Sequence, residues 1–385
     1  MRLFELVFLN ALRHKLRSFL TVLGVAFAVL AFGVIRTMIT AWYAGAEAAK
    51  PDRLVTRNKV SLVFSLPIAY QPKIEQVPGV VTVAPGNWFG GIYKEEKNFF
   101  PQFGVKMEPW FRMYREYVVP PDQWKDVLAE RNACVVGRKL AQRFGWKLGQ
   151  TVPIKGTIFP GDYEFVVRGI YSGRDPGTDE TQFFFHWDYL NEAIEKVYPG
   201  NGNRAGFFVV QIADPANGAA VIQTVDAMFE NSLAETLTET EKAFQLGFVA
   251  MSSTIIAGIH LASVLIIGVV LLVLANTMAM AARERVKEYA VLKTLGFRGW
   301  HLASVIGGES MLLAVVGGTI GLVALLPLIA TLEKQMADFF PSLPIDPLTF
   351  VHGVGISLAV GVAAAIVPAR GAAKVSIVEG LRRIA

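Results

Sequence analysis

The sequence predicts a membrane protein of four transmembrane α-helices with a large α+β domain inserted between the first and the second helix. Three observations support this fold class. The chain of 385 residues is 53% hydrophobic and only 18% charged, with a mean hydropathy of +0.41, which is too apolar for an ordinary soluble protein. Its apolar residues gather in four long stretches, each long enough to cross a bilayer core of about 30 Å. Between the first two stretches, residues 43–245 contain no further span.

Residues 1–42 are predicted to form a surface helix followed by the first span. In residues 1–18, four basic residues and one acid flank an apolar helical stripe, which is typical of an amphipathic helix on the inner membrane surface. Residues 19–42 form the first span, with no charge from Phe19 to Ile35. Small residues at 44–46 leave a cleaved signal peptide as the alternative, but the uncharged run is longer than the apolar region of a signal peptide.

Residues 43–245 are predicted to form an α+β domain outside the cytoplasm. Pairs of proline and glycine, such as Pro78-Gly79 and Pro199-Gly200, recur as turn signals. Short β-branched or aromatic runs between them predict strands at 80–83, 134–136, 165–170, 182–185 and 207–212. Helices are expected at 138–144, 187–198 and 217–230, and residues 94–179 are a candidate for an inserted subdomain. The single cysteine, Cys134, excludes an intramolecular disulfide, so this domain must fold by core packing.

The remaining elements alternate between apolar spans and short polar segments. Residues 246–282 contain no proline and no strong breaker. As one helix they would measure roughly 55 Å at about 1.5 Å per residue, so we expect a second span with a stalk that projects on the outer side. The predicted order after it is a cytoplasmic helix or loop at 283–301, a third span at 302–330, a periplasmic loop at 331–348, a fourth span at 349–367 and a cytoplasmic tail at 368–385. Glycines in the third span permit close helix packing.

Basic residues set the orientation. The loop at 283–301 carries five of them, Arg283, Arg285, Lys287, Lys293 and Arg298, and the tail carries Arg370, Lys374, Arg382 and Arg383. By the positive-inside rule both segments, and both termini, are cytoplasmic. The net charge of +5 and the pI near 9.2 are therefore assigned to membrane topology rather than to nucleic-acid binding.

The loop at 283–301 is the first candidate site. It is predicted to hold a short charged helix that ends at Gly296, a typical C′ glycine. Two interpretations are open: a solvated loop whose charges only fix topology, or a helix that docks a cytoplasmic partner. The second interpretation assigns the docking surface to seven residues, Arg283, Glu284, Arg285, Lys287, Glu288, Leu292 and Gly296.

The rest of the sequence contains few residues that could form a catalytic or metal-binding site. The sequence contains no GxxxxGK[ST] nucleotide-binding loop, no HExxH, no CxxC and no GxSxG, and its five histidines are scattered. We therefore expect neither an enzyme active site nor a metal or cofactor in this chain. His260 and Glu309 fall within spans, where ionisable groups are functional candidates by default. The alternative for Glu309, two turns from the cytoplasmic end, is an ion pair with a lysine or arginine there.

Four groups of segments resemble one known family in the same order along the chain. They are the loop at Ala282–His301, the first-span sequence LRSFLTVLGVAFAV at Leu16–Val29, the outer-domain sequences at Val77–Pro85 and Asn132–Tyr171, and VPARGAAKVSIVEGLRRI at Val367–Ile384. Together they resemble the MacB/FtsX-type permeases of ABC transporters, also called type VII or mechanotransmission permeases. One departure is that Ala26, Phe27 and Ala28 replace the family's alternating glycines in the first span.

The resemblance implies a periplasmic domain, an inner-membrane location and partners. MacB carries its ATPase in the same chain and this sequence has none, so a separate ATPase subunit is implied, which binds ATP and Mg. Two such subunits and a second permease chain, forming a homodimer, complete the expected assembly. MacB-like export would add a periplasmic adaptor and an outer-membrane duct.

Three rival functions remain at this stage. A permease of the LolC/LolE kind would extract lipoproteins from the membrane. An FtsX-like regulator would transport nothing and would activate a cell-wall hydrolase. A membrane-anchored enzyme is the third rival, and the lack of a convergent catalytic set argues against it. The size of the outer domain favours MacB-like efflux.

Overall fold

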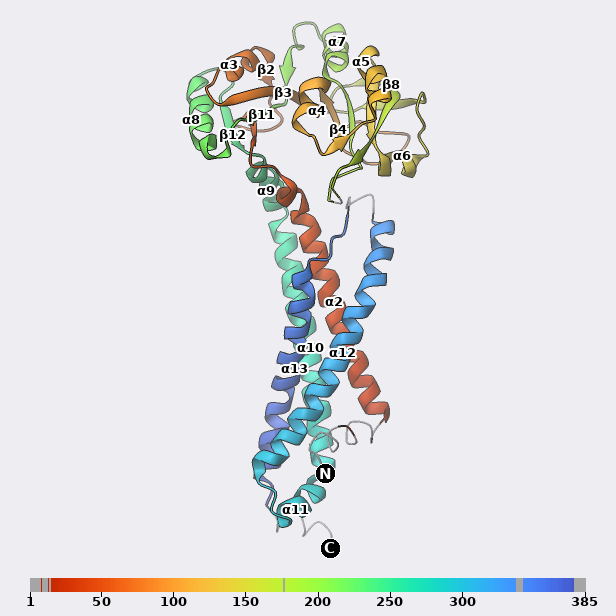
Figure 1. Cartoon of the computed structure of the whole chain (residues 1–385), viewed down its shortest axis with the longest axis vertical. Helices are drawn as coiled ribbons and strands as arrows, with labels where there is room; N and C mark the ends of the chain where they lie inside the picture. The colour runs from red at the N-terminus through yellow and green to blue at the C-terminus, as the bar shows by residue number, and fades with distance from the viewer. Residues whose placement is uncertain (1–7, 9–12, 14, 176, 337–341, 377–385) are drawn as a thin grey trace. The chain divides into compact units, whose positions relative to one another are not determined.

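The computed structural model describes residues 8, 13, 15–175, 177–336 and 342–376. The chain divides into two compact units (Figure 1). A membrane unit comprises Met1–Ala41, Ser252–Gln335 and Leu343–Ala385, and an α/β unit comprises Trp42–Met251 with Met336–Ser342. The predicted fold class is confirmed: four helices long and apolar enough to cross a membrane are present, and the α/β domain lies in the sequence between the first and the second.

Within the described residues, the membrane unit contains four long helices and one short one. They are α2 (Lys15–Ala48), α10 (Ser253–Glu284), α11 (Val286–Thr294), α12 (Gly299–Gln335) and α13 (Pro347–Lys374). Helices α2, α12 and α13 extend beyond the predicted spans at both ends, because the polar residues there continue the helix. The membrane boundaries proposed from the sequence stay predictions. The surface helix expected at 1–18 and the tail arginines Arg382 and Arg383 lie largely or wholly outside the described residues.

The second span differs from expectation at its outer end. The structure has two helices where one was expected through residues 246–282. Helix α9 (Glu241–Met251) and helix α10 are separated by a single residue, Ser252. Ser252, between them, has φ −94° and ψ 8°, and its carbonyl accepts the Ile256 N–H. The interruption falls in the run Ser252, Ser253 and Thr254, residue types that are less favourable inside helices, and the Ser252 side chain makes no capping hydrogen bond. Neither proline nor glycine lies at the interruption.

Glycines let α12 approach its neighbours. A Cβ on Gly317 would lie 2.7 Å from the carbonyl oxygen of Val22 in α2, and one on Gly321 would collide with the carbonyl oxygen of Ala26. Toward α13, the Ser310 hydroxyl donates to the Gly361 carbonyl at 2.7 Å. The glycines expected to permit close packing therefore do so at 317 and 321. Gly307 is different, since it faces open space.

We expect Gly321→Leu to weaken the membrane unit by about 1–3 kcal/mol, the typical cost of overpacking. The control is Gly307→Leu, which makes the same change in the same helix where nothing lies within 4 Å. Thermal unfolding of both variants in mild detergent measures the difference. Equal melting temperatures for the two variants would show that α2 and α12 do not need this close approach.

The α/β unit contains twelve strands within the described residues. They are β1 (Arg53–Asn58), β2 (Leu66–Pro67), β3 (Val80–Trp88), β4 (Gln102–Val105), β5 (Tyr117–Val118), β6 (Ala133–Gly137), β7 (Thr151–Gly156), β8 (Gly161–Gly173), β9 (Phe183–His186), β10 (Arg204–Ala205), β11 (Phe207–Ile212) and β12 (Thr236–Thr240). Its helices are α3 (Gln71–Glu75), α4 (Met107–Met113), α5 (Pro121–Ala129), α6 (Arg138–Phe144), α7 (Trp187–Val197), α8 (Gly218–Met228) and α9, with 3-10 turns at Ile68–Tyr70 and Pro215–Asn217.

One mixed sheet runs through the whole α/β unit. Its strand order is β12-β1-β11-β3-β4-β9-β6-β8-β5, with β7 added beside β8, while β10 and β2 form a separate pair. Strands β4 and β9, and β6 and β8, are parallel, and the other pairs are antiparallel. The proposed subdomain at 94–179 supplies β4 to β8, and β4 joins the rest through its pairing with β3. The two parts therefore share one sheet, and β5 lies at its edge.

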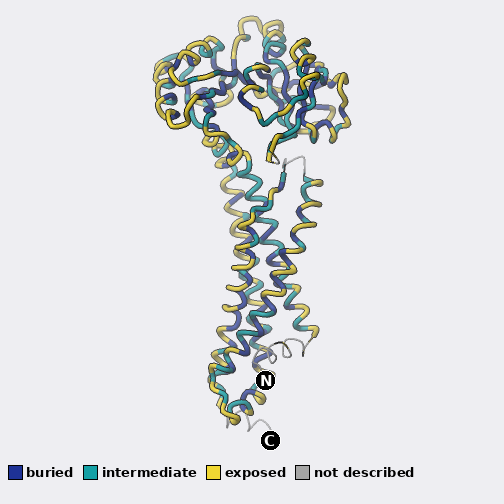
Figure 2. The backbone as a smooth tube through the Cα atoms, in the orientation of Figure 1, coloured by how far each residue is buried: buried dark blue, intermediate teal, exposed yellow. Residues whose placement is uncertain are grey.

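Strand alternation builds the core on both faces of this sheet. In β9, Phe183 and Phe185 enter an aromatic cluster with Phe165, whereas Phe184 points to the opposite face and packs with Trp110. This is the two-residue period of an extended strand. A further cluster around Phe208 and the inner face of α8 fills the other end of the domain. Figure 2 shows these buried strands inside a shell of exposed helices and loops.

Candidate functional site at helix α11

Helix α11 forms the turn between α10 and α12, and its ends follow from local sequence. Helix α10 stops at Glu284 because Arg285 leaves helical geometry, with φ −100° and ψ 14°. At the other end, Gly296 has φ +93°. The Phe297 N–H donates to the Leu292 carbonyl and the Gly296 N–H donates to the Lys293 carbonyl. This is the Schellman arrangement that a C′ glycine permits, and it ends the helix where the sequence indicates.

One face of α11 is buried in the membrane unit. Tyr289 is 4% exposed and Ala290 is fully buried, and Tyr289 packs in the core cluster of this unit with Leu302 and Ile306. Burial raises the pKa of Tyr289 to about 12, so its hydroxyl stays protonated at neutral pH. Helix α11 is therefore a packed part of the bundle and not a free loop.

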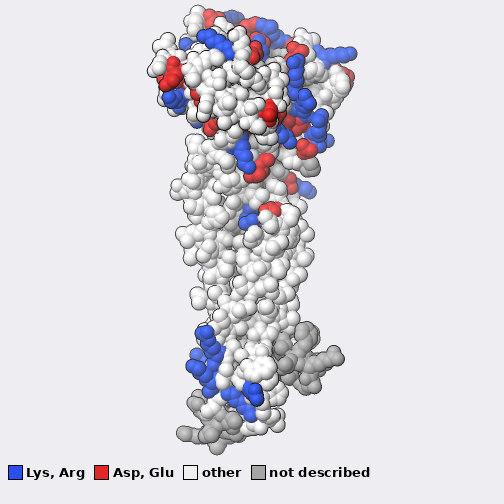
Figure 3. Space-filling view, turned by 60° about the vertical axis from the view of Figure 1, so that its left-hand side comes forward, with Lys and Arg blue, Asp and Glu red and all other residues white. Residues whose placement is uncertain are grey.

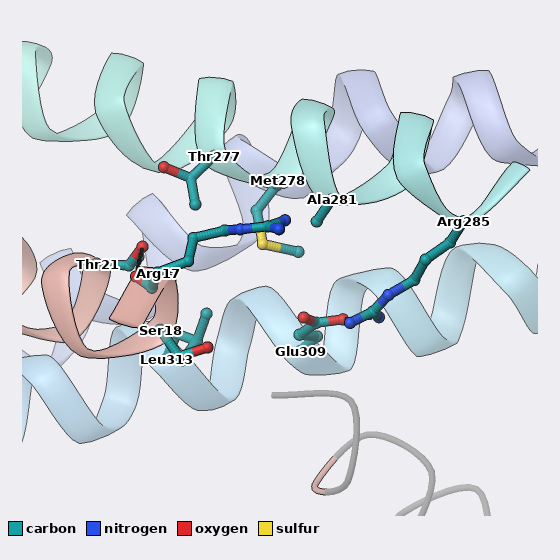
Figure 4. A pocket seen from close by; sticks show the side chains of 9 residues that line it. All are labelled: Arg17, Ser18, Thr21, Thr277, Met278, Ala281, Arg285, Glu309 and Leu313. Carbon is teal, nitrogen blue, oxygen red and sulfur yellow. Dashed lines mark hydrogen bonds and ion pairs between the residues drawn. The ribbon is translucent and has the colours of Figure 1, made fainter. Parts of the chain in front are cut away.

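A buried ion pair fixes the start of α11 to α12. The Arg285 guanidinium lies 2.8 Å from the Glu309 carboxylate, and the two side chains are only 5% and 7% exposed. Figure 4 shows Arg285 reaching across to Glu309, while Arg17 extends from α2 toward Met278 and Ala281 of α10. The cavity between them has a volume of about 10 Å³, enough for a single water molecule. The pair agrees with the pairing alternative given for Glu309.

Further polar contacts fix α11 to the other helices. The carboxylate of Glu284, just before α11, lies 2.5 Å from Arg17 of α2. Glu288 lies 2.5 Å from Arg13. The Lys293 ammonium donates to the carbonyls of Ala373 and Val375 at 2.8 and 2.6 Å, at the C-terminal end of α13, where helix carbonyls lack intrahelical donors. Contacts to α2, α12 and α13 therefore converge on residues 284–293, which comprise the end of α10, Arg285 and most of α11.

The opposite face of α11 is exposed. Lys287, Val291 and Leu295 form a stripe at i, i+4 and i+8, and the two apolar side chains are 46% and 71% exposed. Beside the stripe lies a groove of about 490 Å³. Its lining residues are Arg13, Lys287, Glu288, Tyr289, Val291, Leu292, Phe297, Leu302 and Val305. On the face shown in Figure 3, lysine and arginine side chains gather at this end of the membrane unit.

The structure distributes the seven predicted docking residues over three environments. Arg283, Glu284, Lys287 and Glu288 are exposed. Gly296, the cap, is exposed as well, whereas Leu292 is half-buried and lines the groove. Arg285 is buried, so it does not lie on an exposed surface. Arg285 follows the buried Met278 and Ala281 of α10 at helical spacing, which places it on the same inward-facing side.

Sequence reasoning missed the apolar part of this surface. Leu295, Val291 and Trp300 are exposed large side chains, and in the sequence Leu295 is indistinguishable from a core residue. The i, i+4, i+8 spacing with Lys287 is the signal that could have identified the stripe. The other intramembrane candidate, His260, is exposed on α10, where it makes no hydrogen bond or ion pair with the rest of the described chain. Within the described ranges no three His, Cys, Asp or Glu side chains could share a metal.

A second buried charge network lies in the α/β unit and was also missed. The Glu241 carboxylate, at the start of α9, accepts hydrogen bonds from the Arg53 Nε at 2.7 Å, the Tyr114 hydroxyl at 2.9 Å and the Lys50 N–H at 3.0 Å. Arg53 also bonds Glu116 at 2.8 Å. Burial opposes the charge on Arg53, yet these carboxylates raise the pKa of its guanidinium above the usual value. The network joins the segment before β1 to the segment after β12.

Two known families match the chain. The MacB-like periplasmic core domain matches residues 18–228, more than half of the chain, and the FtsX-like permease C-terminal domain matches residues 260–377. A relative described as an uncharacterized ABC transporter permease from Methanocaldococcus jannaschii is 25% identical over 97% of this chain and 96% of its own length. The macrolide export ATP-binding/permease protein MacB of Neisseria meningitidis is 21% identical over 96% of this chain, which spans only 59% of that protein.

Solved structures of outer domains resemble the α/β unit at the level of fold. The periplasmic region of MacB from Actinobacillus actinomycetemcomitans matches 52% of this chain and 94% of that chain, with 12% identity and a TM-score of 0.38. The extracellular domain of the ABC-type transporter YknZ from Gram-positive bacteria matches 49% of this chain and 100% of that chain, with 13% identity and a TM-score of 0.35. Likeness at this level supports no conclusion about ligands or partners.

Proposed function

This chain belongs to the family of MacB- and FtsX-like ABC transporter permeases, and from this membership we propose that it transmits ATP hydrolysis in a separate ATPase subunit to its α/β domain. It is a multi-pass protein of the inner membrane and a permease component. In the proposal, α11 and both termini are cytoplasmic, the α/β domain is periplasmic, and the ATPase that binds ATP and Mg docks on α11.

The convergence of contacts on α11 is the observation that carries this proposal. A docking helix must accept a partner on one face and pass its displacement to the spans on the other. Helix α11 offers an exposed stripe of Lys287, Val291 and Leu295. On its inner side, a buried ion pair and a lysine that caps α13 connect it to two different spans. A displacement of α11 would therefore reach several helices without an intervening loop.

The proposed activity is MacB-like export of a periplasmic substrate by two permease chains and two ATPases, through an adaptor and an outer-membrane duct. The match of residues 18–228 to the MacB-like periplasmic core domain favours it. FtsX-like control of a cell-wall hydrolase is the second candidate, supported by the match at 260–377. Lipoprotein extraction of the LolC/LolE kind shares the same topology, but no contact among the described residues favours it.

We expect the double substitution Lys287→Glu with Leu295→Asp to reduce ATPase co-purification from native membranes at least about tenfold, since lost apolar contact and reversed charge each weaken an interface. Both side chains are exposed, so the fold should persist. Lys334→Glu is the control, because it reverses an exposed lysine at the far end of α12. Unchanged recovery of the ATPase with the double variant would rule out α11 as the docking helix. Arg285 is unsuitable for this test because it is buried.

A further inference from the structure

We infer that the α/β domain contains a binding site for a small organic anion with a flat aromatic body. The site is a cavity of about 290 Å³, close to the lower size of ligand pockets in proteins. Seven residues line it: Phe111, Arg115, Tyr117, Val118, Val119, Trp124 and Arg174. This inference goes beyond the proposed function and does not depend on it, because binding at this site requires neither ATP nor an ATPase.

The backbone brings the two arginines to the same edge of the sheet. Strand β5 is the edge strand, and its Tyr117 pairs with Gly173 at the end of β8. Next to this pair, the Arg174 N–H donates to the Glu116 carbonyl at 2.9 Å. Arg115 directly precedes Glu116 and Arg174 directly follows Gly173. The antiparallel pairing therefore brings Arg115 and Arg174, which are far apart in the sequence, to the same cavity.

Aromatic rings form the apolar wall of the cavity. Phe111 of α4 lies 5.0 Å from Trp124 of α5 and 6.3 Å from Tyr117, measured between ring centroids. All three side chains are half-buried, and the Tyr117 hydroxyl is held by a 3.2 Å bond to Gln182. Rings fixed in this way offer a flat surface against which an aromatic ligand can stack.

The charge of the cavity is unbalanced. No carboxylate is among its lining residues. Of the acids next to the two arginines in sequence, Glu116 bonds Arg53, and Asp175 is exposed and does not line the cavity. Within the described part of the chain, the Arg115 side chain makes one long bond of 3.4 Å to the Arg112 carbonyl. Two cations without a counter-ion repel one another, and an anion relieves that repulsion. Guanidinium groups bind planar carboxylates through paired N–H donors, so an aromatic carboxylate fits both the charge and the wall.

The test uses the full chain in lipid nanodiscs and two probes of nearly equal shape, 2-naphthoate and the neutral 2-naphthamide. Calorimetric titration should show naphthoate binding at least about tenfold more tightly, since guanidinium groups form stronger hydrogen bonds with a charged carboxylate than with a neutral amide. The double substitution Arg115→Gln with Arg174→Gln should remove this preference. Trp124→Ala should weaken both probes together.

Arg112→Gln is the matched control, because Arg112 is exposed on α4 and does not line the cavity. It should leave the affinity for naphthoate unchanged. Equal affinities for the two probes, or a preference for naphthoate that survives the double substitution, would overturn the inference. The single variant Arg174→Gln, with a smaller expected loss, decides the matter if the double variant fails to fold.

Discussion

Replacing Glu241 with alanine is expected to lower the free energy of unfolding of the α/β domain by about 3–5 kcal/mol, the usual result of removing one partner from a buried ion pair. The carboxylate satisfies three donors at once, from Lys50, Arg53 and Tyr114. Arg53 is 2% exposed, so without Glu241 its charge stays buried with only Glu116 to compensate it. Burial also raises the pKa of Tyr114 well above its usual value, so its hydroxyl cannot ionise and remains a donor without an acceptor.

Thermal unfolding followed by tryptophan fluorescence measures this effect in the intact chain. For a domain of this size about 1 kcal/mol corresponds to 2–4 °C, so we expect the melting temperature to fall by roughly 6–20 °C. The control is Glu235→Ala, which breaks the exposed pair with Lys59 and should change stability by less than about 1 kcal/mol. If the Glu241→Ala protein has the same melting temperature as the control, the network contributes little to the stability of the domain.

Local features of this fold could be predicted from the sequence. Gly296 ends α11 because a residue with positive φ is needed there, and that need is visible in a few neighbouring residues. Strand β11 occupies 207–212 as predicted, since six consecutive β-branched, aromatic and amide residues between turn signals favour an extended strand. Four long apolar stretches likewise specify four spans whatever surrounds them.

Features that depend on distant contacts could not be predicted. Arg53 and Glu241 are 188 positions apart, and no sequence period connects them; only the pairing of β1 with β12 brings their segments together. The cavity with Arg115 and Arg174 depends in the same way on β5 meeting β8. For Glu309 the sequence restricted the partner to a basic residue at one membrane end, but the turn at Arg285 decided which one.

The substitution Glu309→Leu is expected to destabilise the membrane unit by about 3–5 kcal/mol, because it removes the carboxylate that compensates the buried charge of Arg285. Arg285→Leu should cost a similar amount, since it removes the guanidinium that compensates the charge of Glu309. Both side chains are less than a tenth exposed, so bulk water screens the remaining charge poorly. The fraction of protein that remains soluble and monodisperse after heating in mild detergent measures stability. Arg13→Leu, at an exposed pair with Glu288, is the control and should change stability by less than about 1 kcal/mol.

The double variant Arg285→Leu with Glu309→Leu distinguishes the contribution of the ion pair to stability from its contribution to the transmission of movement between α11 and α12. Replacing both partners of a buried pair with apolar residues is often neutral or stabilising, so we expect it to recover most of the stability lost in either single variant. If the pair transmits movement from α11 to α12, the stable double variant should still bind the ATPase yet fail to link ATP hydrolysis to export. An apolar contact can hold two helices together but lets them slide, whereas an ion pair with directional hydrogen bonds fixes their register. A double variant that remains unstable would show that the site needs the charges for folding, and one that exports normally would limit their role to packing.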